Sequence, residues 1–186
     1  MRMEKKVLLN DAEIERTITR IAREISEKVD RIENLALLGI RSRGVHLVRR
    51  IVKKIETVAG VAPHFGEIDI TPYRDDVKSR EVPDRSPLSI AIDNKTVVLI
   101  DDVINTGRTA RAALDLVTSL GKPVKILLAV LIDRGSRQLP IRADIVGKNI
   151  QVEASERINV LLKESDGFDR VTVTPRPREG VSGPAS

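Results

Sequence analysis

The sequence predicts an α/β fold in which a mainly parallel sheet is covered by helices on both faces. Segments with strand and helix patterns alternate along the chain, and the strand segments 35–40 and 125–133 are continuously apolar. Strands of parallel sheets have this pattern because both of their sides are buried. The chain has 186 residues, 41% of them hydrophobic, which suffices for one ordinary core. We therefore expect a single domain over residues 1–174.

The first predicted elements are a short strand and an amphipathic helix. The strand covers residues 7–10 (VLLN), and the spacing of Asn10 and Glu13 is typical of a capping box that opens a helix. Apolar residues then recur at helical spacing on one face, namely Ile14, Ile18, Ile21, Ile25 and Val29. Three arginines share the opposite face: Arg16, Arg20 and Arg23. The segment therefore predicts a helix with a buried side and a basic side.

The next elements continue the alternation of strands and helices. Residues 35–40 (LALLGI) and 65–70 (FGEIDI) predict strands, with an amphipathic helix over 45–56 between them. Residues 96–101 (TVVLID) predict a strand that leads into a helix beginning near Thr109. Such a succession favours parallel strands joined by crossover helices.

The remaining segments are three predicted strands and two irregular stretches. Residues 125–133 (KILLAVLID) predict another core strand, but the residues after them do not continue the sheet pattern and indicate a small appended subdomain. Closing strands are expected over 158–164 and 169–175. Residues 71–95 are polar and rich in Pro and Ser, which predicts a long flexible loop, and residues 175–186 predict a disordered tail.

Composition and charge exclude several classes of protein. Cysteine is absent, which rules out disulfides and thiolate metal sites, and the two histidines lie far apart in sequence. No apolar run approaches the roughly 20 residues that span a bilayer, so we expect no membrane association and a cytoplasmic location. The formal net charge of +5 permits a polyanionic partner, although an ordinary charged surface explains it equally well.

Three polar loops follow predicted strands: 41–44 (RSRG), 73–76 (YRDD) and 101–109 (DDVINTGRT). Ligands of open α/β sheets bind beyond the carboxyl ends of the strands, so these loops are candidate sites. The third loop lies between a strand and a helix, where unpaired backbone N–H groups and the helix dipole favour an anion. It matches neither the P-loop pattern nor Gly-x-Gly-x-x-Gly.

Asp101 and Asp102 stand directly before this predicted anion site. Two carboxylates would repel a polyphosphate, yet they suit the adjacent hydroxyls of a ribose, with Mg²⁺ offsetting the charge. Thr106, Gly107 and Thr109 supply hydroxyls and a flexible backbone that can close around a phosphate. The stretch therefore predicts a site for a phosphorylated sugar.

The stretch from Val97 to Thr109 resembles the phosphoribosyl pyrophosphate signature of type I phosphoribosyltransferases. Further segments resemble the PyrR family, whose members are pyrimidine operon attenuation proteins and also uracil phosphoribosyltransferases. These segments are TRIAREI, LLGIRSRGVHLVRRI, GEIDITPYRDD and DRGSRQLPIRADIVGKNI, and they span most of residues 8–152. The resemblance implies the type I phosphoribosyltransferase fold, with a Rossmann-like sheet, a flexible active-site loop at 71–95, and a hood at about 133–165 completed by the N-terminal segment.

The resemblance also implies roles for individual residues. Asp101 and Asp102 would hold the ribose hydroxyls, with Mg²⁺ near them and bound mainly through the substrate. The rest of the signature would bind phosphoribosyl pyrophosphate or a nucleotide through Val103, Ile104, Asn105, Thr106, Gly107, Arg108 and Thr109. The pyrophosphate would be bound by Ser42, Arg43, Arg74 and Lys78, of which Arg74 would be catalytic together with the two aspartates. Arg134 and a backbone contact near Ile158 would frame the pyrimidine ring.

Asn105 bears on the choice of base. Relatives that use hypoxanthine or guanine have an aspartate directly before Thr-Gly, which exchanges a proton with the purine, and an asparagine amide cannot do so. This disfavours a purine substrate and favours uracil, whose nitrogen would displace pyrophosphate without a protein nucleophile. The PyrR family has a tyrosine there, so the rate or the base affinity is expected to differ from the family norm.

The resemblance implies RNA binding as well, through two groups of residues. They are Thr19, Arg20 and Arg23 on the first helix, and Arg137, Arg142 and Lys148 in the hood. Arginines on a polar helix face are more commonly just its solvated side, so binding of a pyrimidine operon leader mRNA requires the two groups to converge. A homodimer or higher homo-oligomer would join such patches. The PyrR family commonly has histidine at the positions of Arg23 and Ser136. This chain therefore differs from the family at two positions of the predicted RNA surface.

Three functions are consistent with these patterns. The first is an attenuator that senses UMP or UTP and also converts phosphoribosyl pyrophosphate and uracil to UMP and pyrophosphate. The second is a uracil salvage enzyme whose basic surface has no RNA role. The third is a regulator that keeps the nucleotide site but catalyses poorly because of Asn105 and an altered loop.

Overall fold

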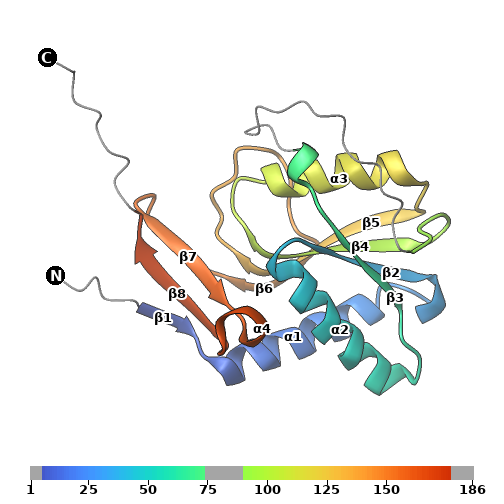
Figure 1. The fold of residues 1–186 in the computed structure, drawn as a ribbon, viewed down its shortest axis with the longest axis horizontal. Coiled ribbons are helices and arrows are strands. Elements are labelled where there is room, and N and C mark those ends of the chain that lie inside the picture. The colour runs from blue at the N-terminus through green and yellow to red at the C-terminus, as the bar shows by residue number, and fades with distance from the viewer. Residues whose placement is uncertain (1–5, 74–89, 177–186) are drawn as a thin grey trace, which may run out of the picture.

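The computed structural model describes residues 6–73 and 90–176 and contains two sheets (Figure 1). The larger is a five-stranded parallel sheet in the order β3-β2-β4-β5-β6, and the smaller is a three-stranded antiparallel sheet in the order β1-β8-β7. The strands are β1 (Lys6–Leu9), β2 (Leu35–Ile40), β3 (His64–Ile68), β4 (Thr96–Ile104), β5 (Lys125–Asp133), β6 (Ile145–Asn149), β7 (Glu156–Leu161) and β8 (Arg170–Pro175). The predicted α/β class with a mainly parallel sheet is confirmed.

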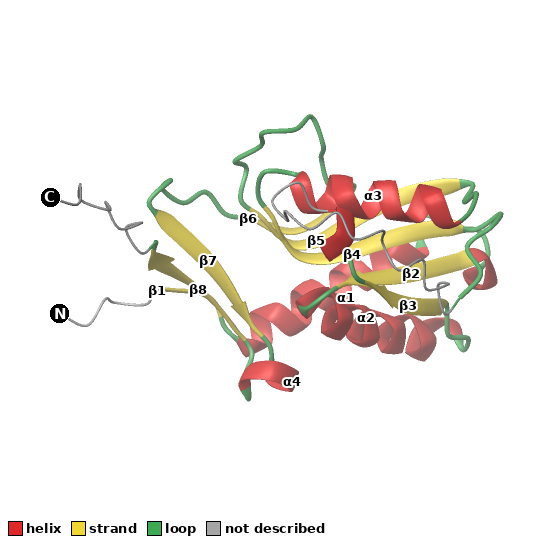
Figure 2. Ribbon diagram, turned by 45° about the horizontal axis from the view of Figure 1, so that its top comes forward, coloured by secondary structure: helices red, strands yellow, loops and turns green. Residues whose placement is uncertain are grey.

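Helices cover both faces of the larger sheet (Figure 2). The helices are α1 (Asp11–Ser26), α2 (Arg43–Ala59), α3 (Arg108–Leu120) and α4 (Lys163–Asp166), with short 3-10 turns at Ile32–Asn34 and Thr71–Tyr73. One core cluster joins α1, α2 and the small sheet to one face, and a second cluster joins α3 to the other face. Every residue of β2 is buried, as expected for a central strand covered on both sides. No helix in the described ranges is long and apolar enough to cross a membrane.

The first helix begins and packs as its sequence predicts. The Asn10 side chain accepts a hydrogen bond from the Glu13 N–H, and the Glu13 carboxylate accepts one from the Asn10 N–H, each at 2.9 Å. These two bonds satisfy donors that a helix start otherwise leaves unpaired. The predicted stripe of isoleucines is buried against the larger sheet: Ile14, Ile18, Ile21 and Ile25. Val29 lies beyond the end of the helix at Ser26.

The expectation that the chain leaves the main sheet after residue 133 was wrong for β6. This strand pairs in parallel with β5 and forms an edge of the larger sheet, so the small sheet consists of β1, β7 and β8. The predicted hood at about 133–165 therefore does not coincide with the small sheet, because β6 lies within those residues and belongs to the larger sheet. β6 lacks an apolar run because its central residue, Gly147, packs so closely that an added Cβ would lie 2.3 Å from the Leu131 oxygen. Only Ile145 is fully buried in this strand.

A close contact between α2 and β4 depends on Gly44. A Cβ added at Gly44 would lie 2.3 Å from the carbonyl oxygen of Ile100, which is shorter than atoms can tolerate. The absence of a side chain lets the first turn of α2 lie directly on β4. This contact places the start of α2 beside the end of β4, where polar residues follow both strands.

The Gly44→Ala variant is expected to lower the free energy of unfolding by about 2 kcal/mol, because the methyl group forces α2 away from β4. The matched control is Gly60→Ala, where an added Cβ meets nothing within 4 Å and only the φ of +72° is unfavourable. Gly60→Ala should lower the free energy of unfolding by about 1 kcal/mol. Urea unfolding of both variants measures the difference. Equal or smaller destabilisation by Gly44→Ala would show that the contact is not tight.

Candidate active site

The candidate site lies where β2 and β4 end. These neighbouring strands are parallel, so their carboxyl ends lie at the same edge of the sheet. β2 leads into Ser42 and Arg43 at the start of α2, and the peptide bond between Arg41 and Ser42 is cis. β4 leads into α3 through the residues around Thr106. Two of the three loops that the sequence predicts as sites therefore meet. Of the third, 73–76, only Tyr73 is described.

Asp101 and Asp102 lie inside β4, near its carboxyl end at Ile104, and both are partly buried. The Asp102 N–H donates to the Asp101 carboxylate and the Val103 N–H donates to the Asp102 carboxylate, each at 2.9 Å. Burial raises the pKa of the Asp101 carboxyl well above its usual value, and the neighbouring charge of Asp102 raises this pKa further. The Asp101 carboxyl therefore holds its proton more readily than a solvated aspartate does.

The residues after the aspartates surround a cavity of about 150 Å³. We call residues 105–109 the phosphate loop. Gly107 has a φ of +92°, in the left-handed region that favours glycine, and α3 begins at the next residue. The predicted residues that line the cavity are Asp101, Val103, Ile104, Asn105, Thr106, Gly107 and Thr109. Backbone N–H groups at the start of a helix and small residues around a polar cavity are suited to a phosphate.

Arg108 is the one predicted member of the loop that does not line this cavity. Its side chain is exposed, and its Nε donates to the Gln138 side chain at 3.1 Å. The amide oxygen of Asn105 is buried and has no hydrogen-bond partner among the described residues. Asn105 thus lines the cavity, while its amide oxygen is closed off from solvent.

A second cavity, of about 360 Å³, lies between the start of α2 and the small sheet. Arg43, Asp102 and Ile158 line it, as three of the predicted site residues. Four polar residues that line it were not predicted from the sequence: Arg157, Asn159, Thr172 and Thr174. Their alternation with apolar residues in β7 and β8 was a signal that polar side chains share one face of these strands. The Asn159 amide donates to the Thr174 hydroxyl at 3.0 Å across that face.

Arg134 lines neither of these two cavities. Its side chain is buried, and its Nη2 donates to the Glu153 carbonyl oxygen at 2.9 Å. The Arg134 Nε has no hydrogen-bond partner among the described residues. Burial lowers the pKa of the guanidinium, the charge of Arg176 lowers it further, and the charge of Glu156 opposes this. The contact of Arg134 with a base stays a prediction.

The basic residues predicted to bind RNA have different environments. Arg20 reaches from α1 to β6, where its guanidinium donates to the carbonyl oxygens of Val146, at 3.0 Å, and of Gly147. This contact brings the basic face of α1 next to β6, which carries Lys148. The side chains of three exposed residues form no hydrogen bond or ion pair with another described residue: Arg23, Arg142 and Lys148. Arg137 is mostly buried and bonded to other parts of the chain, with 19% of its side chain exposed.

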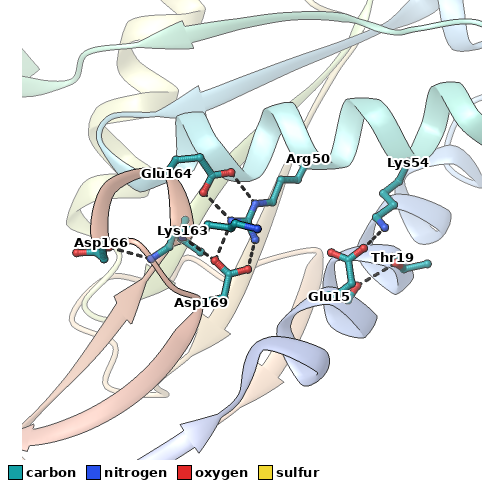
Figure 3. Close-up of polar contacts among 9 residues, drawn as sticks. Glu15, Thr19, Arg50, Lys54, Lys163, Glu164, Asp166 and Asp169 are labelled. Atoms are coloured by element: carbon teal, nitrogen blue, oxygen red, sulfur yellow. Dashed lines mark hydrogen bonds and ion pairs between the residues drawn. The ribbon is translucent and has the colours of Figure 1, made fainter.

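A third, larger cavity of about 910 Å³ runs between α1 and α2 and is bordered by Thr19 and Arg23. Figure 3 shows the polar contacts of Arg50, Lys54 and Glu15, which also border it. At its end, Arg50 of α2 binds two carboxylates of the segment after β7, Glu164 at 2.8 and 2.6 Å and Asp169 at 2.8 Å. The hydrogen bonds to Asp169 and then to Glu164 raise the pKa of the Arg50 guanidinium. Burial alone would raise the pKa of Asp169, but hydrogen bonds from Arg50 and from the Lys163 N–H outweigh it and lower this pKa.

Residues 6–73 and 90–176 contain no group of three or more His, Asp or Glu side chains that could hold a metal ion alone. The adjacent Asp101 and Asp102 carboxylates fit the way Mg²⁺ binds beside phosphates, since this ion keeps several waters and uses one or two carboxylates together with the substrate.

The parallel sheet, the paired aspartates and the glycine-containing turn into α3 together define a phosphoribosyltransferase. The model of the phosphoribosyl transferase domain matches residues 6–162. A hypoxanthine phosphoribosyltransferase from Staphylococcus aureus superposes with a TM-score of 0.70 over 92% of this chain and 93% of its own, at 22% identity, which shows a shared fold.

The chain belongs to the PyrR family. The bifunctional protein PyrR of Chloroflexus aurantiacus is 52% identical over 173 residues, which cover 91% of this chain and 94% of that protein. The bifunctional protein PyrR of Corynebacterium glutamicum is 50% identical over 182 residues, covering 94% of this chain and 95% of that protein. The predicted family and fold are confirmed.

Proposed function

We propose that the protein transfers the phosphoribosyl group of phosphoribosyl pyrophosphate to uracil, and that it regulates pyrimidine genes by binding leader mRNA when UMP or UTP occupies the same site. The observation that carries this proposal is the 52% identity to a bifunctional PyrR protein over 91% of the chain. That identity extends across both the phosphoribosyl site and the basic segments. It disfavours the alternative of a salvage enzyme without an RNA role.

The geometry supports binding of different parts of the substrates in the two cavities. The 150 Å³ cavity at the phosphate loop is suited to the 5′-phosphate of the ribose. Asp101 and Asp102, beside it, would hold the ribose hydroxyls. The 360 Å³ cavity, with Arg43 and the β7 segment around Ile158, would receive the pyrophosphate and the base. Arg74 and Lys78 lie outside the described residues and stay predictions for pyrophosphate binding.

The reaction forms a bond between a uracil ring nitrogen and the anomeric carbon and breaks the bond from that carbon to pyrophosphate. The nitrogen loses its proton, and pyrophosphate leaves with the electron pair. Mg²⁺ bound through the substrate would offset the charge on the departing pyrophosphate. Arg43 would do the same from the protein, since it lines the cavity beside Asp102, although its guanidinium is shared with the Asp166 carboxylate at 3.3 Å. The aspartates stabilise the positive charge that develops on the ribose ring.

The choice of base gives a direct test of the enzymatic part. Asn105 lines the phosphate cavity with an amide, which cannot exchange a proton with a purine nitrogen. Purified protein with phosphoribosyl pyrophosphate and Mg²⁺ is expected to form UMP from uracil and no nucleotide from hypoxanthine or guanine. Chromatography of the products measures both. Nucleotide formation from hypoxanthine at the uracil rate would contradict the proposed substrate.

The exposed basic residues give a test of the RNA part. Replacing Arg142 and Lys148 with glutamine is expected to weaken binding of a pyrimidine operon leader RNA about tenfold and to lower the salt slope by about 2, because each removed cation contacts about one phosphate. Filter binding at several salt concentrations measures the slope. The control is Lys122→Gln, at an exposed residue after α3 and outside the proposed surface. An unchanged slope in the double variant would remove both residues from the surface.

RNA binding also requires a surface large enough for a folded loop. The Arg20 contacts to β6 join the α1 and β6 residues into one surface within a single chain. A homodimer or higher homo-oligomer would extend this surface across its symmetry axis. Sedimentation of the protein at assay concentrations tests this part of the proposal, and a monomer would leave only the single-chain surface.

A further inference from the structure

The loop 134–141, between β5 and β6, is bonded to the back of the phosphate loop. The guanidinium of Arg137 donates from Nη1 to the carbonyl oxygen of Asn105 at 2.9 Å and, more weakly, to that of Ile104 at 3.5 Å. Its Nε donates to the Ile141 carbonyl oxygen at 2.8 Å, and its Nη2 to the Asp133 carboxylate at 2.6 Å. The side chain thus binds three carbonyl oxygens, in two separate parts of the backbone, and one carboxylate.

Backbone groups of the same loop fix the neighbouring peptide units. The N–H groups of Gln138 and Leu139 both donate to the Thr106 carbonyl oxygen, at 3.0 and 3.1 Å, and the Arg134 N–H donates to the Ile104 carbonyl oxygen at 3.0 Å. A Cβ added at Gly107 would lie 3.5 Å from the Leu139 Cβ, so the two segments are in contact. The carbonyl oxygens of three successive residues, 104–106, therefore all accept bonds from the loop 134–141.

The direction of these carbonyls decides where the N–H groups point. In a planar trans peptide the C=O and the following N–H point in opposite directions. Holding the carbonyls of Ile104, Asn105 and Thr106 toward the loop 134–141 therefore turns the N–H groups of residues 105–107 away from it. These three residues line the 150 Å³ cavity. The bonds to the loop thus orient N–H donors for an anion, which is the arrangement that phosphate binding requires.

We propose that Arg137 is a positioning residue of the phosphoribosyl site, which sets the geometry of the phosphate loop from behind, and that it is not an RNA contact. This inference rests on the proposed transfer from phosphoribosyl pyrophosphate. The Asp133 carboxylate neutralises the guanidinium, and only 19% of the Arg137 side chain is exposed, so little charge is offered to an RNA phosphate. The planar fork of arginine holds several acceptors in a fixed arrangement, whereas the lysine ammonium is a compact charge with freely rotating donors.

The Arg137→Gln variant should raise KM for phosphoribosyl pyrophosphate about tenfold or more, because bonds from a charged group to the phosphate loop are lost. KM for uracil should stay within about twofold, since the loss falls on the N–H groups proposed to bind the sugar phosphate and not on the cavity proposed for the base. Added guanidinium at low millimolar concentration should restore part of the lost affinity in an Arg137→Ala variant. A purely structural role would not give this split between the two substrates or this rescue. The matched control is Arg49→Gln, an exposed arginine on α2.

Calorimetric titration with ribose 5-phosphate separates the inference from the proposed function. Weaker binding of ribose 5-phosphate by Arg137→Gln, with unchanged leader RNA affinity in the absence of nucleotide, supports the inference. Suppose that the unaltered protein binds ribose 5-phosphate and forms UMP, while Arg137→Gln keeps both KM values and the same ribose 5-phosphate affinity. The inference alone is then overturned. If Arg137→Gln lowers the RNA affinity measured without added nucleotide and leaves both KM values unchanged, Arg137 belongs to the RNA surface. If the unaltered protein neither binds ribose 5-phosphate nor forms UMP, both the proposed function and the inference are contradicted.

Discussion

Replacing Asp101 and Asp102 together with asparagine is expected to lower the rate of UMP formation by about 10³-fold. Asparagine keeps the size and much of the hydrogen bonding of aspartate but removes the negative charge that stabilises the developing positive charge on the ribose. Initial rates at saturating uracil and phosphoribosyl pyrophosphate measure the effect. Activity within tenfold of the unaltered protein would mean that the site lies elsewhere.

The same replacement should leave the protein folded. The pKa of Asp101 is raised mainly by burial, so ionisation of this carboxyl opposes folding. A carboxyl whose folded pKa is above its unfolded value of about 3.9 costs stability as the pH rises from that value toward the folded pKa. The Asp101→Asn variant lacks this cost and should be at least as stable as the unaltered protein at pH 7. Urea unfolding at pH 4 and pH 7 is the control that separates a lost charge from a lost fold.

The Arg50→Met variant is expected to lower the free energy of unfolding by about 3 kcal/mol at pH 7. It leaves the carboxylates of Glu164 and Asp169 without their main partner, and only 5% of the Asp169 side chain is exposed. Hydrogen bonds from Arg50 lower the pKa of Glu164, and they help to lower that of Asp169 against its burial. Carboxylates with lowered folded pKa values add stability above their unfolded values of about 4, and this stability is lost as the pH falls through the folded values.

The penalty of Arg50→Met should therefore be largest at neutral pH and shrink below about pH 4, where the carboxylates become protonated. Urea unfolding between pH 3 and pH 7 follows this change. Arg49→Met is the matched control, because Arg49 is the exposed neighbour on the same helix. A penalty that is equal for both arginines, or independent of pH, would contradict the role assigned to the Arg50 cluster.

Much of the candidate site could be predicted from sequence because its parts follow apolar strands directly. Asp101 and Asp102 directly follow the buried apolar run of β4, and a parallel sheet brings the carboxyl ends of β2 and β4 together. The capping box at Asn10 and the isoleucine stripe of α1 are local patterns that tertiary contacts did not alter.

Other features depend on contacts between distant segments and leave no local pattern. β6 is an edge strand with a glycine at its closest contact, so it lacks the apolar run that marks the central strands. Arg137 and Arg142 look alike in sequence, yet Arg137 is bonded to the phosphate loop and Arg142 is exposed. The cavity residues Asn159 and Thr174 become neighbours only when β7 pairs with β8. Such roles follow from tertiary position rather than residue type.

The central claim is that nucleotide binding at the phosphoribosyl site and RNA binding are coupled in one protein. It is tested most directly by titrating a pyrimidine operon leader RNA with the protein at moderate salt, with and without UMP, in a gel shift. The account predicts that UMP tightens RNA binding about tenfold, within the usual range of coupling between two sites, and that phosphoribosyl pyrophosphate opposes it. Equal RNA affinity with and without UMP would contradict the claim and leave a phosphoribosyltransferase with an uncoupled basic surface.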